Sequence, residues 1–185
     1  CSAQWCKWRR AQYLQRILAK PGLNSEFLTQ CYAIRFLAMK AVLQRVKSSK
    51  VYVGEEEVAS ISVGLNILLG VCVGDTEEDV KKLVEKVVNL RIFEDGSGKF
   101  NLSLLDVKGE ALVVSQFTLC ASLRKGRRPS FELAEKPDRA RELYELFVKR
   151  LSEQVPTYKG VFGASMEVHI VNWGPVTIIL DSKEL

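Results

Sequence analysis

From residue 39 onward, hydrophobic positions follow two different periods, which together predict a mixed α/β domain. Alternating or continuous apolar segments of strand length, several of them separated by glycine-containing turns, predict eight or nine β-strands. These segments are 40–47, 50–53, 58–63, 65–73, 91–93, 99–104, 111–119, 165–171 and 176–180. The runs 65–73 and 111–119 are continuously apolar, which is typical of buried strands.

Two further segments show the helical period instead. In the first, Asp75 is the predicted N-cap, with Glu78 three residues later. Its core face has the spacing i, i+3, i+4 and consists of Val80, Leu83, Val84, Val87 and Val88. The second helix begins at Pro137, and its apolar face consists of Ala140, Leu143, Tyr144, Phe147 and Leu151. We therefore predict the fold class α/β, with mixed β-sheets covered by two helices.

Composition changes at Met39 and divides the chain into an extension, 1–38, and a domain, 39–185. The extension carries six basic side chains and one acidic one, which accounts for the whole net charge of +5. It can be interpreted as a targeting peptide, or as a basic amphipathic helix on a membrane or nucleic acid. The interpretation that we favour is non-native upstream sequence with Met39 as the natural start, because the first strand begins at the next residue.

Several classes of protein lack support in the sequence. No apolar run is long enough to span a bilayer, so we expect no membrane association. The five cysteines form no C-x-x-C pair, and Cys72 and Cys120 lie in apolar runs, so we predict buried free thiols and a reducing compartment. The single histidine, His169, is predicted to face solvent from a strand. We find no metal-ligand spacing, phosphate loop or dinucleotide fingerprint, and we expect no metal and no cofactor.

Two short polar motifs remain as candidates for chemistry. Ser115-Gln-Phe-Thr-Leu119 ends an apolar strand, and a twist or bulge there would bring Ser115 and Thr118 near the opening of one pocket. The alternative is an ordinary strand end. The second motif, 172–177, contains Gly174-Pro175, which is either a plain turn or a cis peptide whose neighbouring carbonyls form a receptor for an ammonium group.

With these motifs, the sequence from Met39 to Ser182 resembles the D-aminoacyl-tRNA deacylase family. The matching stretches are 41–46, 68–71, 89–93, 99–106, 115–119, 124–131, 162–166 and 172–177. The pairing of Ser-Gln-Phe-Thr with a late Gly-Pro-Val-Thr is highly specific to that family. Trp173 departs from the pattern, since many members carry a small polar residue there.

The resemblance implies a β/β/α layered fold and a cytoplasmic homodimer that cleaves the ester between a D-amino acid and the 3′ end of tRNA, as translation proofreading. It implies that Gly174-Pro175 is cis, enters the partner's site and binds the substrate's α-ammonium through its carbonyls. Arg45 would hold this loop, with Asn172 and Met166 as further substrate-binding residues. An L side chain would meet the Gly-Pro wall, whereas glycine, which has no side chain, would be accepted. Ser115, Gln116, Phe117 and Thr118 would line the catalytic pocket.

Two mechanisms fit these residues. Thr118 could act as nucleophile or donor, although no base is evident beside it. We favour hydrolysis assisted by the RNA 2′-hydroxyl, with backbone amides near Phe117 and Thr118 stabilising the oxyanion.

The basic loop is interpreted either as a contact for tRNA phosphates or as a solvated loop. Its basic residues are Arg124, Lys125, Arg127 and Arg128. The alternative functions are a non-catalytic nucleic-acid-binding protein with the same fold, and a hydrolase of small D-amino esters.

Overall fold

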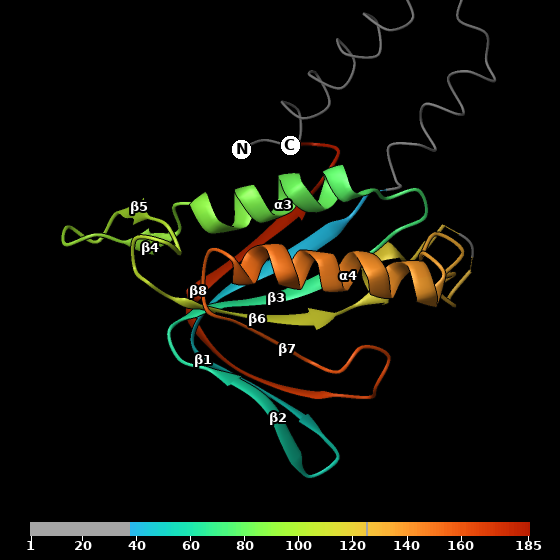
Figure 1. Ribbon diagram of the computed structural model, residues 1–185, viewed down its shortest axis with the longest axis horizontal. Helices are drawn as coiled ribbons and strands as arrows, with labels where there is room; N and C mark the ends of the chain where they lie inside the picture. The colour runs from blue at the N-terminus through green and yellow to red at the C-terminus, as the bar shows by residue number, and fades with distance from the viewer. Residues whose placement is uncertain (1–37, 125) are drawn as a thin grey trace, which may run out of the picture. The chain divides into compact units, whose positions relative to one another are not determined.

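A computed structural model describes residues 38–124 and 126–185 of the chain (Figure 1). In these residues, eight strands, two α-helices and one 3-10 helix follow one another along the sequence. Their order is β1 (Lys40–Val53), β2 (Glu56–Ile61), β3 (Gly64–Gly70), α3 (Glu77–Asn89), β4 (Phe93–Glu94), β5 (Phe100–Leu102), β6 (Glu110–Ser115), the 3-10 helix η1 (Phe117–Cys120), α4 (Pro137–Ser152), β7 (Thr157–Lys159) and β8 (Glu167–Asp181).

The main sheet has six strands and mixed direction, as the sequence predicts. Strands β3, β6 and β7 are parallel neighbours, whereas β1 pairs antiparallel with β2, β3 and β8. Strand β1 has one edge along β8 and shares its other edge between β3, at 40–46, and β2, at 49–53. A separate two-stranded sheet consists of β4 and β5.

The sheet curls so that it encloses one core and covers another. The larger core lies between the sheet and the helices and includes Ile67 and Val113. The smaller core contains Leu112 and Val114, with residues of β1, β2 and β8 around them. Strands β3 and β6 thus send alternate side chains into two cores, which explains why their sequences are apolar at nearly every position.

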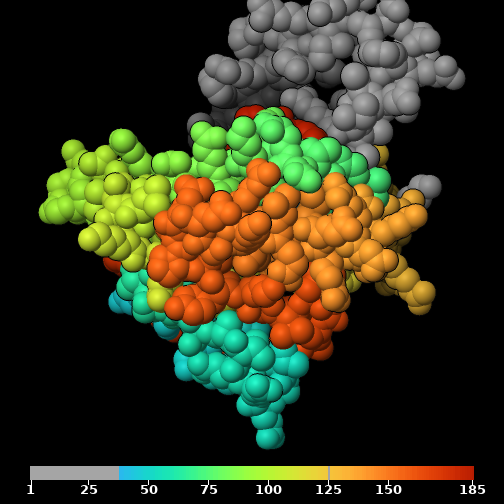
Figure 2. Space-filling view, in the orientation of Figure 1, coloured from blue at the N-terminus to red at the C-terminus, as the bar shows by residue number. Residues whose placement is uncertain are grey.

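Helices α3 and α4 lie side by side over one face of the sheet (Figure 1). All ten apolar positions predicted for the two helices are buried. In the space-filling view, α4 covers the front, while the hairpin of β4 and β5 projects at the left and the hairpin of β1 and β2 projects at the bottom (Figure 2). The predicted fold class, an α/β fold with mixed strands beneath two helices, is confirmed.

The N-terminus of α3 differs from the prediction by one residue. Thr76, not Asp75, is the N-cap, because Asp79 accepts hydrogen bonds from both the backbone N–H and the hydroxyl of Thr76. Asp75 is buried beneath this cap and accepts from the backbone N–H of Cys72 at 2.7 Å. Burial, with repulsion from Asp79 as a smaller cause, raises the pKa of Asp75 to about 7.

Asp79 also anchors the C-terminal end of the domain to α3. The hydroxyl of Ser182 and the ammonium of Lys183 donate to its second oxygen at 2.8 and 2.6 Å. Burial opposes the ionised form of Asp79, but the hydrogen bonds from Lys183, Ser182 and Thr76 together outweigh it and lower the pKa to about 2.

Several strand predictions need correction. The predicted strands 40–47 and 50–53 are one strand, β1, and the last two predicted strands are one strand, β8. Strand β6 ends at Ser115 instead of Leu119, because the chain turns there into η1. Neither α3 nor α4, the helices in the described part of the chain, has the length and apolar character to cross a membrane.

Candidate active site

The first polar motif forms a tight turn at the carboxyl end of β6. Ser115 is the last residue of the strand, and Phe117 and Thr118 begin the 3-10 helix η1. We call residues 115–120 the catalytic turn, after the role that the family resemblance implies for residues 115–118. Ser115 is half-buried, whereas Phe117 is 58% exposed and Thr118 is also exposed. The polar and aromatic side chains of the turn are therefore accessible to a substrate.

Thr118 has a neutral hydrogen-bond partner in the turn. The side-chain amide of Gln116 donates to its hydroxyl oxygen at 2.5 Å. An amide cannot remove the proton of a hydroxyl, so this contact orients Thr118 without activating it as a nucleophile. The geometry thus gives no support to a protein-borne base at this position.

The catalytic turn lies directly against the end of β3. The backbone N–H of Gln116 donates to Leu69 O at 2.8 Å. A Cβ atom at Gly70 would lie 2.8 Å from the Cβ of Leu119 and 2.9 Å from Gln116 O, which is too close for any side chain. Glycine at position 70 therefore allows the close approach of the turn to β3.

A disulfide bond between Cys72 and Cys120 corrects the prediction of free thiols. Both residues are buried, as expected, but the curl of the chain after β6 brings Cys120, at the end of η1, against Cys72, just beyond β3. They are separated by 48 positions. Such a long-range pair leaves no local spacing signal in the sequence.

The second motif forms a bulge in β8 opposite a single residue of β1. Gln44 pairs with Thr177 and Val46 pairs with Asn172, so the four residues 173–176 face Arg45 alone. The Gly174–Pro175 peptide bond within this bulge is cis, as the family resemblance implies, and both residues are exposed. Asn172 closes the bulge, because its side-chain oxygen accepts from the backbone N–H of Val176 at 3.3 Å.

Arg45 joins the bulge to the hairpin of β4 and β5. Its guanidinium donates to Trp173 O at 2.9 Å, to Ile92 O at 2.8 Å and to the carboxylate of Glu94 at 3.0 Å. Its side chain is only 1% exposed, whereas that of Glu94 is 40% exposed. The planar guanidinium suits three acceptors in three directions, which a lysine ammonium could not serve equally well.

Two aromatic rings lie near the charged group of Arg45. The centre of the guanidinium is 4.7 Å from the Trp173 ring and 5.2 Å from the Phe100 ring. Contacts of this kind attract a cation to the ring electrons. Sequence reasoning singled out Arg45 but missed Glu94 and Phe100, because they reach it only through the folding of a separate hairpin.

Within one chain, the bulge and the catalytic turn are separate. No hydrogen bond, ion pair or ring contact among the described residues joins Arg45, Gly174 or Pro175 to residues 115–118. Met166, the remaining predicted substrate-binding residue, packs against the smaller core. Its sulfur occupies space beside Gly160, where a Cβ would lie 2.6 Å away.

The basic loop adjoins the catalytic turn. Reciprocal backbone hydrogen bonds of 2.8 and 2.9 Å between Ser122 and Ser130 close the loop. The rings of Phe117 and Phe131, one on each side of the loop, are in edge contact with centroids 5.0 Å apart. The loop exposes Arg124, Arg127 and Arg128 to solvent, while Lys125 lies outside the described residues. Positive charge thus stands next to the exposed turn.

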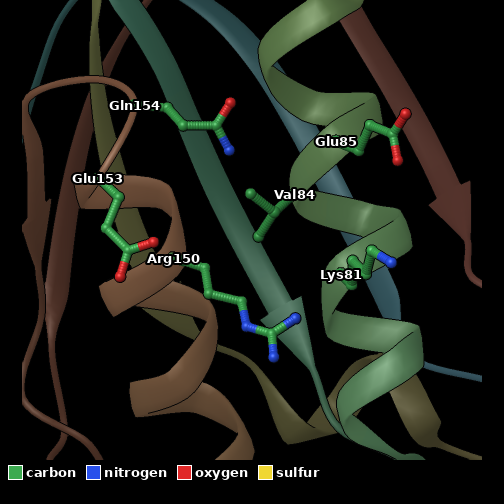
Figure 3. Close-up of a pocket in the computed structure, with 6 residues that line it drawn as sticks. All are labelled: Lys81, Val84, Glu85, Arg150, Glu153 and Gln154. Carbon is green, nitrogen blue, oxygen red and sulfur yellow. The ribbon is translucent and has the colours of Figure 1, made fainter.

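Other candidate chemistry lies apart from these residues. His169 is exposed on β8, as predicted, and its Nε2 contacts the carboxylate of Glu167. No cluster of side chains in the ranges 38–124 and 126–185 could hold a metal ion. A groove of about 400 Å³ lies between α3 and α4 (Figure 3), and it contains none of the predicted site residues. Its lining consists of Lys81, Val84, Glu85, Arg150, Glu153 and Gln154.

A family match and two relatives agree on one family. Residues 42–181 match the family described as D-Tyr-tRNA(Tyr) deacylase. A "D-aminoacyl-tRNA deacylase" of Aquifex aeolicus is 62% identical over 148 residues, covering 80% of this chain and 100% of the relative. The protein of the same name from Persephonella marina is 62% identical over 147 residues, covering 80% of this chain and 100% of the relative.

Two solved structures share the fold. One, titled "c-Myc DNA Unwinding Element Binding Protein", has a TM-score of 0.73 and 43% identity, and the match covers 76% of this chain and 97% of that one. The other, titled "Structural Analysis of a probable eukaryotic D-amino acid tRNA deacylase", has a TM-score of 0.67 and 18% identity. That match covers 78% of this chain and 99% of the other, and at this identity it supports the fold alone.

Proposed function

Because the chain belongs to the D-Tyr-tRNA(Tyr) deacylase family, we propose that it hydrolyses the ester between a D-amino acid and the 3′ end of tRNA. Water is added across the ester, so that the products are a free D-amino acid and uncharged tRNA. The observation that carries this proposal is the 62% identity with a D-aminoacyl-tRNA deacylase over that relative's full length. The exposed catalytic turn and the exposed bulge of β8 supply the residues for it.

The ester carbonyl binds at the catalytic turn. Backbone N–H groups near Phe117 and Thr118 stabilise the negative charge that develops on the carbonyl oxygen. The 2′-hydroxyl of the terminal adenosine orients or activates the attacking water, since the partner of Thr118 is a neutral amide. The exposed ring of Phe117 offers a surface on which the adenine base can stack.

The bulge of β8 selects the configuration of the amino acid. The carbonyl oxygens of Gly174 and Pro175 bind the α-ammonium group of the substrate. Once the ammonium and the ester are both held, a D side chain points to open space and an L side chain meets the Gly-Pro wall. Arg45 supports the selection because it holds the preceding carbonyl, that of Trp173. Glycine on tRNA has no side chain to reject and is also a substrate.

Two copies of the chain complete the site. No hydrogen bond, ion pair or ring contact in the described part of the chain joins Arg45, Gly174 or Pro175 to residues 115–118, although the reaction needs both segments. Each bulge therefore enters the site of the partner subunit in a homodimer. The exposure of Val171 and Ile179 on β8, at 53% and 73%, favours burial of this strand against a second copy.

The basic loop binds phosphates of the tRNA acceptor stem. Exchanging both Arg127 and Arg128 for glutamate is expected to weaken tRNA binding and to reduce its salt slope by about one for each lost phosphate contact. Arg139, which pairs with Glu142 on α4, supplies the control R139E. Equal affinity of the double variant and the control for tRNA would exclude this role.

The decisive experiment compares D-Tyr-tRNA and L-Tyr-tRNA at equal enzyme concentration, with Gly-tRNA as a third substrate. We expect rapid hydrolysis of the D and glycyl esters and background hydrolysis of the L ester. Equal rates with both enantiomers would disprove the selection, and no hydrolysis of any ester would disprove the activity. The variants S115A and T118A are expected to keep much of the activity, whereas loss of turnover with intact binding would make the hydroxyl essential.

A nucleic-acid-binding function is the second candidate. It is favoured by the 43% identity with a structure titled as a DNA-unwinding-element binding protein. Measuring affinity for single- and double-stranded DNA beside tRNA separates the two. Binding of DNA without ester hydrolysis would favour this candidate.

Residues 39–185 form the catalytic unit in our proposal, and residues 1–38 are dispensable. A chain that begins at Met39 is therefore expected to hydrolyse D-Tyr-tRNA at the rate of the full chain. We propose the cytoplasm as the location because charged tRNA is used there. Because Cys72 and Cys120 form a disulfide, these cysteines do not favour a reducing compartment, and the chemistry of the substrate is what supports this location.

A further inference from the structure

We propose that the Cys72–Cys120 disulfide is a positioning element of the catalytic turn, so that ester hydrolysis depends on its oxidation state. The inference rests on the proposed function of residues 115–118 in ester hydrolysis. It concerns two buried sulfur atoms at the end of the turn, which touch no substrate. Their effect is exerted through the backbone that carries Phe117 and Thr118.

The turn has little internal support. At its two ends, backbone hydrogen bonds run from Leu119 N to Gln116 O and from Ala121 N to Thr118 O, each 3.1 Å long. A single 3-10 turn has poorer hydrogen-bond geometry than an α-helix and is used only in short pieces. The exposed ring of Phe117 contributes little burial. The position of the turn therefore depends on its attachments at both ends.

Each end of the turn is attached to β3 or to its continuation. At the beginning, Gln116 N donates to Leu69 O. At the end, the sulfur of Cys120 is bonded to that of Cys72. The close approach of Leu119 to Gly70 lies between these two points, and that packing requires both ends to stay in place. Without the disulfide, the turn keeps the Gln116–Leu69 hydrogen bond, the Phe117–Phe131 ring contact and the Ser122–Ser130 pair beyond its end, but no covalent bond joins Cys120 to the segment after β3.

Cys72 is itself held firmly. Its backbone N–H donates to buried Asp75 at 2.7 Å, and the residue forms an antiparallel bridge with Ala134. The next residue, Val73, donates from its N–H to Leu133 O at 2.9 Å. The disulfide thus connects the exposed turn to a backbone that is fixed from two other directions, which is the arrangement expected of a positioning element.

Reduction would remove this connection by a balanced exchange. A dithiol supplies two electrons and two protons, the S–S bond breaks to give two cysteine thiols, and the reductant becomes a cyclic disulfide. The end of the turn can then shift with the basic loop that follows it. Displacements of about 1 Å at a reacting group can lower rates by about 100-fold. We expect at least a tenfold loss.

The test uses the full chain in which Cys1, Cys6 and Cys31 are replaced by serine, so that thiol chemistry reports only on the remaining pair. Single-turnover hydrolysis of D-Tyr-tRNA is measured for the oxidised protein, the reduced protein and the C72S/C120S variant at 25 °C. Thiol titration in denaturant verifies each state, and circular dichroism verifies folding. Affinity for uncharged tRNA is measured in parallel.

We expect the reduced protein and C72S/C120S to react at least tenfold more slowly than the oxidised protein, with tRNA affinity within twofold. Reoxidation is expected to restore the rate of the reduced protein but not that of the serine variant. Equal rates in all three forms would overturn the proposal, even if thermal stability fell, because the disulfide would then stabilise without positioning. So would free thiols at positions 72 and 120 in protein purified in air.

A second measurement separates this inference from the proposed function. Amide hydrogen exchange of residues 115–121 is expected to be at least tenfold faster in folded, reduced protein than in oxidised protein, whether or not any ester is cleaved. If the oxidised protein cleaves no ester, the proposed function fails while the exchange data still decide on positioning. Unchanged exchange in this segment would refute it.

Discussion

Replacing Arg45 with lysine tests the connection between the bulge of β8 and the hairpin of β4 and β5. Lysine keeps the positive charge but can serve only part of the set formed by Trp173 O, Ile92 O and the Glu94 carboxylate. Two lost hydrogen bonds to a charged donor cost about 1.5–3 kcal/mol each. Partial exposure of Glu94 lowers the sum, so we expect a loss of about 3 kcal/mol in the free energy of unfolding.

Thermal and denaturant unfolding measure this loss, with R139K as the matched control. Arg139 forms a single exposed ion pair with Glu142, so its replacement is expected to change stability by less than about 0.5 kcal/mol. For R45K, the melting temperature should fall by roughly 6–12 °C. The rate with D-Tyr-tRNA should fall at least tenfold, since the bulge loses its support. A melting temperature and a rate equal to those of R139K would refute the reasoning.

Three further predictions concern buried polar groups. D79N should lose about 2 kcal/mol in the free energy of unfolding at pH 7, because a folded-state pKa of about 2 means that ionised Asp79 stabilises the fold above pH 3.8. In urea unfolding, this loss should become smaller as the pH falls toward 2. D75N should have a higher free energy of unfolding than the wild type at pH 8, because the raised pKa of about 7 makes ionised Asp75 destabilising. Below about pH 4, the two proteins should be equally stable. No gain in stability at pH 8 would contradict the burial argument. Y144F should lose about 1 kcal/mol in denaturant unfolding, because the Tyr144 hydroxyl donates to Val113 O at 2.9 Å.

The elements that depend on local pattern were predictable from the sequence. Each helix has a core face with a regular period, and Pro137 is at the first turn of α4 as expected. The runs around Ile67 and Val113 are buried strands because they are apolar on both faces. In these segments, the apolar side chains that identify the helix or strand in the sequence are also the ones that pack into the core, so the local pattern is enough to predict the element.

Features that depend on long-range register could not be predicted from pattern. Whether residues 173–176 form a turn between two strands or a bulge within one is decided by pairing with β1, more than 120 positions earlier in the chain. The same distance hides the contacts of Arg45 with Glu94 and Phe100. The N-cap was missed by one residue, because Asp75 and Thr76 are both good capping residues and only the position of Asp79 decides between them. The roles of the site residues remain predictions.

The sharing of β3 and β6 between two cores makes the domain an indivisible folding unit. Without the residues that cover the smaller core, Leu112 and Val114 would be exposed to water, and without the helices, Ile67 and Val113 would be exposed. Both layers should therefore melt in a single transition, seen alike by helical circular dichroism and, in a chain that begins at Met39, by the fluorescence of Trp173. Amides of these central strands should be the last to exchange with solvent, which places the catalytic turn at the end of the most persistent part of the molecule.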